Sequence, residues 1–193
     1  MNSIKYIFVL FLLNPGVGVS EKCSNSFSPR KQYYEYMLRL ASDRGYVKTV
    51  KKMLKKDINI DAQNKEGQTA LHRASDKNHP EIVSLLLENK ANVDIQDEKG
   101  ETALHLASKG DYLEVAELLL QGGANVDIQD ENGATALHFA VWQKHKKMEA
   151  LLLKEREGVY LHGQTSGADL LQLAKDLGPE KVEELLKRQL GKL

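Results

Sequence analysis

Residues 67–74 are Gly-Gln-Thr-Ala-Leu-His-Arg-Ala, and nearly the same motif returns at 100–107 and again at 133–140. The glycines that open the three motifs are separated by 33 residues in both intervals. A fixed period of this length is typical of a solenoid, in which every unit buries its apolar side against the next unit. The repeat therefore decides the fold.

Two further blocks return with the same period. Glu-Ile-Val-Ser-Leu-Leu-Leu at 81–87 is matched by 114–120, and Ala-Asn-Val-Asp-Ile-Gln-Asp occurs at both 91–97 and 124–130. At these residues the chain resembles the ankyrin repeat family, whose unit is a β-turn followed by two antiparallel helices. The resemblance implies an all-α solenoid of about five helix–turn–helix units joined by β-hairpin-like turns.

The period divides the chain into a leader, a linker and a repeat domain. We expect a signal peptide at 1–20, a linker at 21–32, and an ankyrin repeat domain at 33–193 with repeats at 33–66, 67–99, 100–132, 133–166 and 167–193. The first and last repeats depart from the pattern, as expected where one face meets water. The fourth carries one extra residue, placed within 157–165, so the hairpin after it is not determined by the pattern.

Each motif pairs a helix-capping threonine with a histidine three residues later, a variant of the capping box: Thr69 with His72, Thr102 with His105, and Thr135 with His138. Three copies at one repeat position, without nearby cysteines or convergent acidic residues, favour a structural role over metal binding or catalysis. The preceding glycines are expected in turn conformations that side chains disfavour. We also expect Leu86 to be buried, and Leu71, Leu104 and Leu137 to form a buried row at even intervals.

The first twenty residues differ from the rest. A lysine precedes the apolar run 6–13, Asn14-Pro15-Gly16 interrupts any helix, and small residues precede Glu21. This is the pattern of a secretory signal peptide, and the run is shorter than the ~20 residues that span a bilayer. We therefore predict a secreted chain without membrane insertion of its mature form. The alternative is a cytoplasmic ankyrin protein whose leader is not cleaved.

Composition excludes several classes of function. Lys and Arg number 27, equal to Asp and Glu, so no sequence-wide charge attracts nucleic acid or an anionic membrane. The single cysteine, Cys23, excludes an intrachain disulfide and a thiolate zinc site. No nucleophile–base–acid set, phosphate loop or metal-ligand cluster is present, which predicts a chain that is not an enzyme and needs no cofactor. We expect a monomer, with a structural array that oligomerises through Cys23 as the alternative.

The resemblance implies a protein partner that binds the concave face, built from hairpin tips and the exposed side of the inner helices. Trp142 differs most from its equivalents, which are Asp43, Asp76 and Lys109. Exposed tryptophan is enriched in binding hot spots. The alternative is that Trp142 packs over 157–165. The candidate partner-binding residues are Arg73, Asp76, Lys77, Glu98, Lys99, Glu101, Lys109, Phe139, Trp142 and Gln143. There are two alternative functions: an intracellular adaptor or inhibitor, and a structural spacer.

Overall fold

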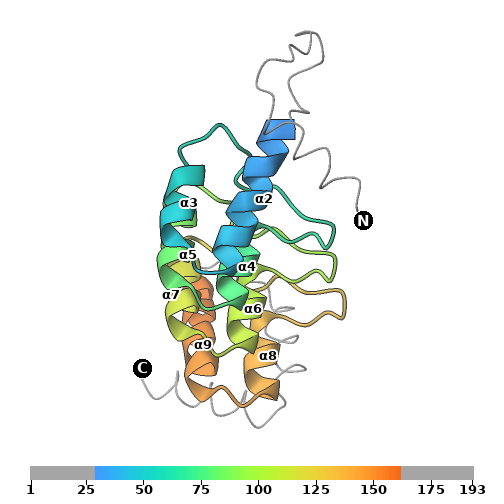
Figure 1. Ribbon diagram of the computed structural model, residues 1–193. Coiled ribbons are helices and arrows are strands. Elements are labelled where there is room, and N and C mark those ends of the chain that lie inside the picture. Colours follow the sequence, from blue (N-terminus) through green and yellow to red (C-terminus); the bar gives the residue numbers. More distant parts are fainter. Residues whose placement is uncertain (1–28, 162–193) are drawn as a thin grey trace, which may run out of the picture.

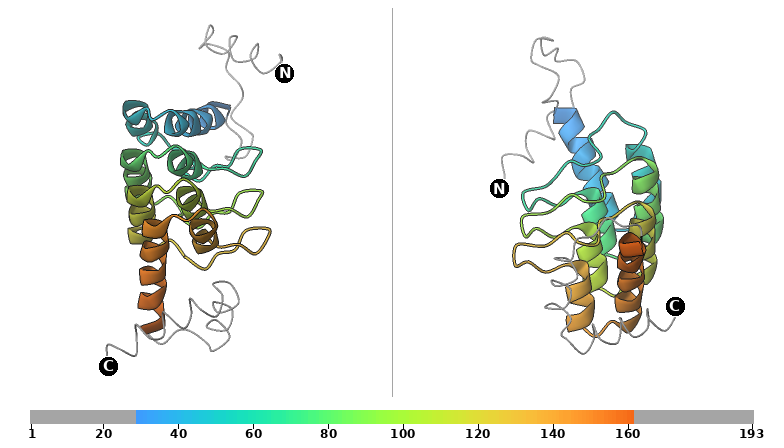
Figure 2. Two further views of the ribbon diagram at one scale, coloured as in Figure 1. Left: turned by 90° about the horizontal axis from the view of Figure 1, so that it is seen from below. Right: turned by 180° about the vertical axis from the view of Figure 1, so that it is seen from behind.

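The computed structural model describes residues 29–161, which form eight α-helices in four stacked pairs (Figures 1 and 2). The helices are α2 (Pro29–Asp43), α3 (Val47–Met53), α4 (Ala70–Asp76), α5 (Pro80–Glu88), α6 (Ala103–Lys109), α7 (Leu113–Gln121), α8 (Ala136–Trp142) and α9 (Lys146–Leu161). No strand occurs in this part of the chain. The predicted signal peptide, Cys23 and the predicted fifth repeat at 167–193 lie outside the described residues.

The helices form two layers. The inner layer is α2, α4, α6 and α8, the outer layer is α3, α5, α7 and α9, and each helix packs on the next one in its own layer. The loops that join one pair to the next project from the inner layer (Figure 2, left). This arrangement confirms the predicted all-α ankyrin solenoid for the four described repeats.

The predicted capping boxes are present at the start of α4, α6 and α8. In α4, Thr69 Oγ1 accepts the His72 backbone N–H at 3.3 Å, and His72 Nδ1 accepts the Thr69 backbone N–H at 3.2 Å. Because Nδ1 is an acceptor, the ring proton lies on Nε2, which donates to the Glu101 carbonyl at 3.0 Å. His105 Nε2 makes the equivalent contact to the Ala134 carbonyl at 3.1 Å. Each of these two histidines therefore caps its own helix and joins its repeat to the next.

The projecting loops depend on glycine. Gly67, Gly100 and Gly133 have φ values of 74°, 73° and 76°, which confirms the predicted turn conformation. A Cβ at Gly67 would lie 2.7 Å from the Glu98 backbone nitrogen, which donates to the Glu66 carbonyl at 3.1 Å. Glycine thus permits both the backbone angle and the close approach of the next loop.

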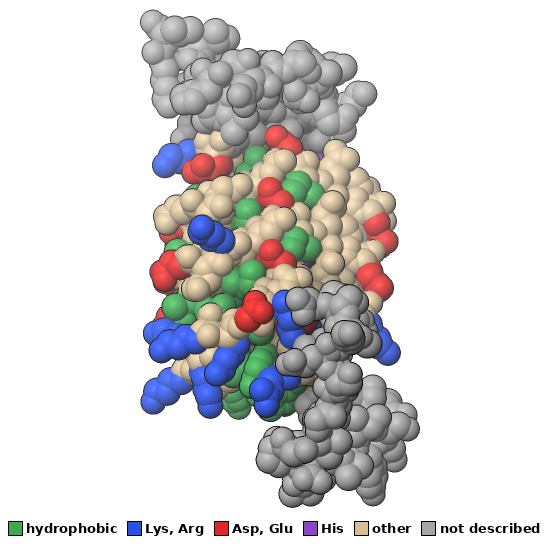
Figure 3. All heavy atoms as spheres, turned by 90° about the horizontal axis from the view of Figure 1, so that it is seen from above, with side chains coloured by type: hydrophobic (Ala, Val, Ile, Leu, Met, Phe, Trp, Pro, Cys, Tyr) green, Lys and Arg blue, Asp and Glu red, His purple; other side chains and the backbone are tan. Residues whose placement is uncertain are grey.

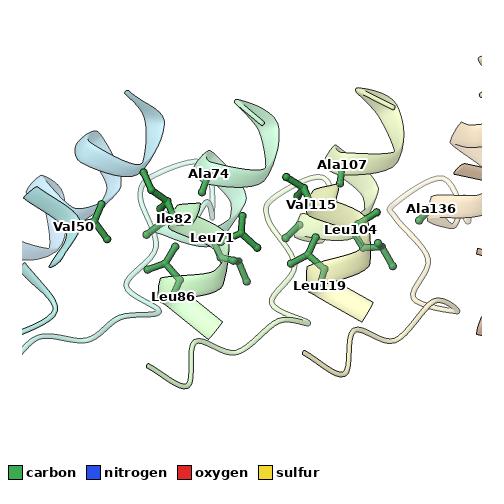
Figure 4. Close-up of a cluster of buried hydrophobic side chains, with 14 of the residues drawn as sticks. Val50, Leu71, Ala74, Ile82, Leu86, Leu104, Ala107, Val115, Leu119 and Ala136 are labelled. Carbon is green, nitrogen blue, oxygen red and sulfur yellow. The ribbon is translucent and has the colours of Figure 1, made fainter. Parts of the chain in front are cut away.

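The core is a repeated set of apolar side chains between the two layers. Leu71, Leu104 and Leu137 are all buried, and Leu86 is fully buried, as predicted. Figure 4 shows the sets contributed by two neighbouring repeats, Leu71, Ile82 and Leu86 in one and Leu104, Val115 and Leu119 in the next. The row at even intervals therefore exists, and it places the inner helices side by side.

The two ends of the described stack differ from the interior repeats. α2 begins at Pro29, inside the predicted linker 21–32 and four residues before the predicted domain start, because proline is well tolerated in the first helical turn. α9 has 16 residues, whereas α7 has nine and ends before Gly122-Gly123. The equivalents of those glycines in α9 are Glu155 and Arg156, which are good helix formers, so the helix continues to Leu161.

Candidate binding surface on the inner helices

The first half of the predicted surface consists of charged side chains that are bound to one another. Arg73 on α4 donates to the Asp43 carboxylate of α2 at 2.5 Å and to Gln68 Oε1 at 3.1 Å. Asp76 and Lys77 form an ion pair at 2.9 Å, and hydrogen bonding to that carboxylate raises the pKa of Lys77. Between α2 and α4 the surface is therefore polar and internally paired.

The second half is organised around Lys109 on α6. Its ammonium pairs with the Glu101 carboxylate and lies 4.5 Å from the centre of the Phe139 ring on α8. A cation at this distance over an aromatic face is attracted by the ring. Lys109 therefore joins an acidic group of its own repeat to an aromatic group of the next.

Glu101 lies elsewhere than predicted. We expected it at an exposed hairpin position, but the residue is only 5 % exposed, so that prediction of exposure is wrong. The residue directly precedes the capping threonine of α6, its backbone N–H donates to Asp97 Oδ1, and its carbonyl accepts His72 Nε2. Its main chain is fixed between two repeats, and its side chain lies beside Lys109 instead of at the loop tip.

An aromatic cluster, made of His138, Phe139 and Trp142, ends the described surface on α8. The Phe139 and Trp142 rings meet edge to face with centroids 5.4 Å apart, and the His138 and Trp142 centroids are 5.7 Å apart. Phe139 is half-buried and also contacts His105, with centroids 5.9 Å apart. Trp142 itself is 62 % exposed. The next residue, Gln143, is the C-cap of α8 and is also exposed.

The exposed hairpin residues Glu98 and Lys99 are held on a hydrogen-bonded frame that the sequence reasoning missed. Gln63 Nε2 donates to the Gly67 carbonyl at 2.7 Å and to the Gln96 carbonyl of the next hairpin at 3.2 Å. Gln96 repeats both bonds one period later. The repeated glutamine in Asn-Val-Asp-Ile-Gln-Asp was the available signal, since a polar residue kept at one repeat position can bond across repeats.

Acidic side chains join the same hairpins a few residues earlier. Asp61 Oδ1 accepts the Asn92 backbone N–H at 3.0 Å, and Asp94 Oδ1 accepts that of Asn125 at 2.9 Å. Partial burial raises the pKa of Asp61, while the hydrogen bond from Asn92 opposes that change. The hairpins are therefore tied to one another by side chains as well as by backbone.

The described residues contain no group of three or more His, Cys, Asp and Glu placed to hold a metal ion. Among the helices within 29–161, none is both long enough and apolar enough to cross a membrane.

Two family models match the chain. One, described as ankyrin repeats (3 copies), matches residues 89–165, and the other, described as ankyrin repeats (many copies), matches residues 53–107. Together they cover more than half of the sequence. The chain belongs to the ankyrin repeat family. Ankyrin repeats are a protein-interaction module and are typically not enzymes. A comparison with curated proteins gave no significant match.

Proposed function

We propose that this ankyrin repeat protein binds a partner protein through its inner-helix surface, with Trp142 as the anchor. The observation that carries the proposal is the 62 % exposure of Trp142 at a repeat position where Asp43 and Lys109 are engaged in ion pairs. Large aromatic side chains that enter a pocket on a partner contribute most to the affinity of many interfaces. No catalysis and no cofactor are part of this function.

The packing around Trp142 supports an anchoring role. Phe139 and His138 both contact the indole, so less side-chain entropy is lost when a partner covers it than for an indole without neighbours. Phe139 is itself fixed by Lys109, whose charge is neutralised by Glu101. We therefore expect the partner to present an apolar pocket to Trp142 and polar groups to the paired surface between α2 and α6.

The test compares two exposed aromatic residues. Immobilised wild-type protein captures the partner, which mass spectrometry identifies, and the affinities of Trp142→Ala and Tyr46→Ala for it are then measured. Tyr46 is 53 % exposed on the first repeat and serves as the matched control. We expect Trp142→Ala to weaken binding by at least about 30-fold and Tyr46→Ala to leave it nearly unchanged.

Urea denaturation of the same variants separates binding from packing. Because Trp142 is mostly exposed, Trp142→Ala should lower the free energy of unfolding by less than about 1 kcal/mol. A larger loss of stability, with partner affinity retained, would show that the indole packs against the rest of the chain and would refute the anchoring role.

We also propose that the protein is secreted. The lysine, the apolar run 6–13 and the small residues before Glu21 support this proposal. Sequencing the mature N-terminus provides the test: a chain that starts at Glu21 agrees with export, whereas a chain that retains Met1 supports the cytoplasmic alternative.

A further inference from the structure

The equal numbers of acidic and basic residues conceal a separation of charge along the stack. Residues 29–57, which contain α2 and α3, carry nine Lys and Arg against three Asp and Glu. Residues 58–131 carry six against fifteen. Figure 3 shows the Lys and Arg side chains gathered at the end of the stack that α2 and α3 form. Residues 132–161 carry five against three, so the first repeat is the most basic part of the described stack and the second and third repeats are acidic.

Five lysines supply the centre of this surface, which we call the lysine face: Lys48, Lys51, Lys52, Lys55 and Lys56. All five are exposed. Lys51 pairs with Glu81 at 3.1 Å, and the Lys56 ammonium lies 6.0 Å from the centre of the Tyr34 ring. Within residues 29–161, Lys48, Lys52 and Lys55 form no ion pair. Most of the positive charge is thus available to a partner.

The role of an end repeat explains why these residues are polar but does not explain their sign. A terminal repeat needs a hydrophilic outer side, and glutamate would provide one. Lys48 is matched by Glu81, Glu114 and Lys147 in the later repeats, and Lys55 is matched by Glu88, Gln121 and Lys154. The fold therefore accepts either charge at these positions.

The uniform sign also has a cost within the helix. Lys48 and Lys52 are separated by one helical turn, a spacing at which like charges repel. Cations near a helix C-terminus are favourable, but α5 and α7 have no basic residue in their last turn, so the fold does not require them. A surface that keeps three lysines without an ion pair in the described part of the chain, beside two more positive charges, is suited to an anionic partner.

We propose that the lysine face docks on an anionic lipid surface, which for the secreted chain proposed above is an outward-facing leaflet. Attraction to anionic lipids needs only point charges near the bilayer and is similar for lysine and arginine. Nucleic-acid recognition favours the bidentate arginine fork, whereas α3 and the turn after it contain lysine alone. This surface lies on the first repeat and is separate from the aromatic cluster on the fourth, so it adds a second contact to the proposed function.

The test uses the full-length chain and sedimentation with vesicles of phosphatidylcholine, with or without phosphatidylserine. The variant is Lys48→Glu with Lys55→Glu, which introduces the residues that the second repeat carries at these positions, Glu81 and Glu88. The control is Lys147→Glu with Lys154→Glu, which changes the equivalent exposed positions of the fourth repeat and alters the net charge equally.

Each lysine near an anionic surface is worth about fivefold in binding, so the first-repeat variant should bind phosphatidylserine vesicles at least about 30-fold more weakly. The control should remain within about threefold of the wild type, and added salt should weaken wild-type binding. Equal binding to pure phosphatidylcholine, or equal losses in both variants, would overturn the proposal. Binding to a duplex oligonucleotide without binding to vesicles would assign the surface to nucleic acid, and binding to neither would remove it as a docking site. None of these outcomes depends on Trp142.

Discussion

The first repeat and the interior repeats use one backbone but different side chains at equivalent positions. Leu85 and Leu118 are half-buried against the core of the second and third repeats, whereas their equivalent in the first repeat, Lys52, is exposed. Met53, the equivalent of Leu86, stays buried in the first repeat. The position of Met53 and Leu86 is thus apolar in both repeats. The residue type at the position of Lys52 and Leu85 depends on whether a neighbouring repeat covers it.

The largest expected effect concerns the buried position that all these repeats share. Leu86→Ala should lower the free energy of unfolding by about 2–5 kcal/mol, because the leucine is fully buried. Met53→Ala should cost less, since Met53 is 6 % exposed in a repeat without a preceding neighbour among the described residues. Urea denaturation measures both. A loss under about 1 kcal/mol for Leu86→Ala, or equal losses for the pair, would contradict the comparison.

Exchanging leucine and lysine at the position of Lys52 and Leu118 should change the free energy of unfolding by a smaller amount. Leu118→Lys should destabilise the protein by about 1–3 kcal/mol, because a half-buried apolar contact is replaced by a charge. The reverse change, Lys52→Leu, should alter stability by less than about 0.5 kcal/mol, since the side chain stays in water. If both changes had the same effect, burial of this position would not depend on a preceding repeat.

The smallest expected effect is on pH dependence, and it concerns two histidines of the interior repeats. Burial lowers the pKa of His72 and His105 below the ordinary value of 6.5, although hydrogen bonds to the next repeat oppose this change. Below that pH the unfolded chain binds protons that the folded chain excludes, so stability should fall as the pH drops from 6.5 toward the folded pKa values. The slope is at most about 1.4 kcal/mol per pH unit for each histidine.

Urea denaturation at pH values above and below 6.5 measures that slope. His72→Gln is the control, because glutamine can occupy the same place in a capping box but cannot be protonated. The variant should show a shallower dependence on pH than the wild type. Stability that did not change with pH, or a slope unaffected by His72→Gln, would show that these histidines do not link folding to protonation.

Much of the fold could be predicted because the repeat multiplies every local signal. One Thr-Ala-Leu-His motif is weak evidence for a capped helix, but three in register predicted the capping boxes, the glycine turns and the row that includes Leu71. The ends were harder to predict. The helix start at Pro29 and the extension of α9 to Leu161 depend on residues that occur once and have no repeated equivalent.

The candidate surface could be predicted only in outline. Periodicity placed Trp142 on the inner helices, and the structure shows that its side chain is exposed. The sequence did not predict that Glu101 turns toward Lys109, or that Lys109 lies over the ring of Phe139. These contacts join residues of different repeats or of a loop and a helix, and their geometry follows from how the helices are stacked.

The sequence by itself determined the unit, its length and its buried leucines, because period and local propensity are properties of consecutive residues. Only the tertiary structure decided which charges are paired and which aromatic ring remains exposed. Those features depend on distances between side chains of successive repeats, which are set when the repeats pack side by side.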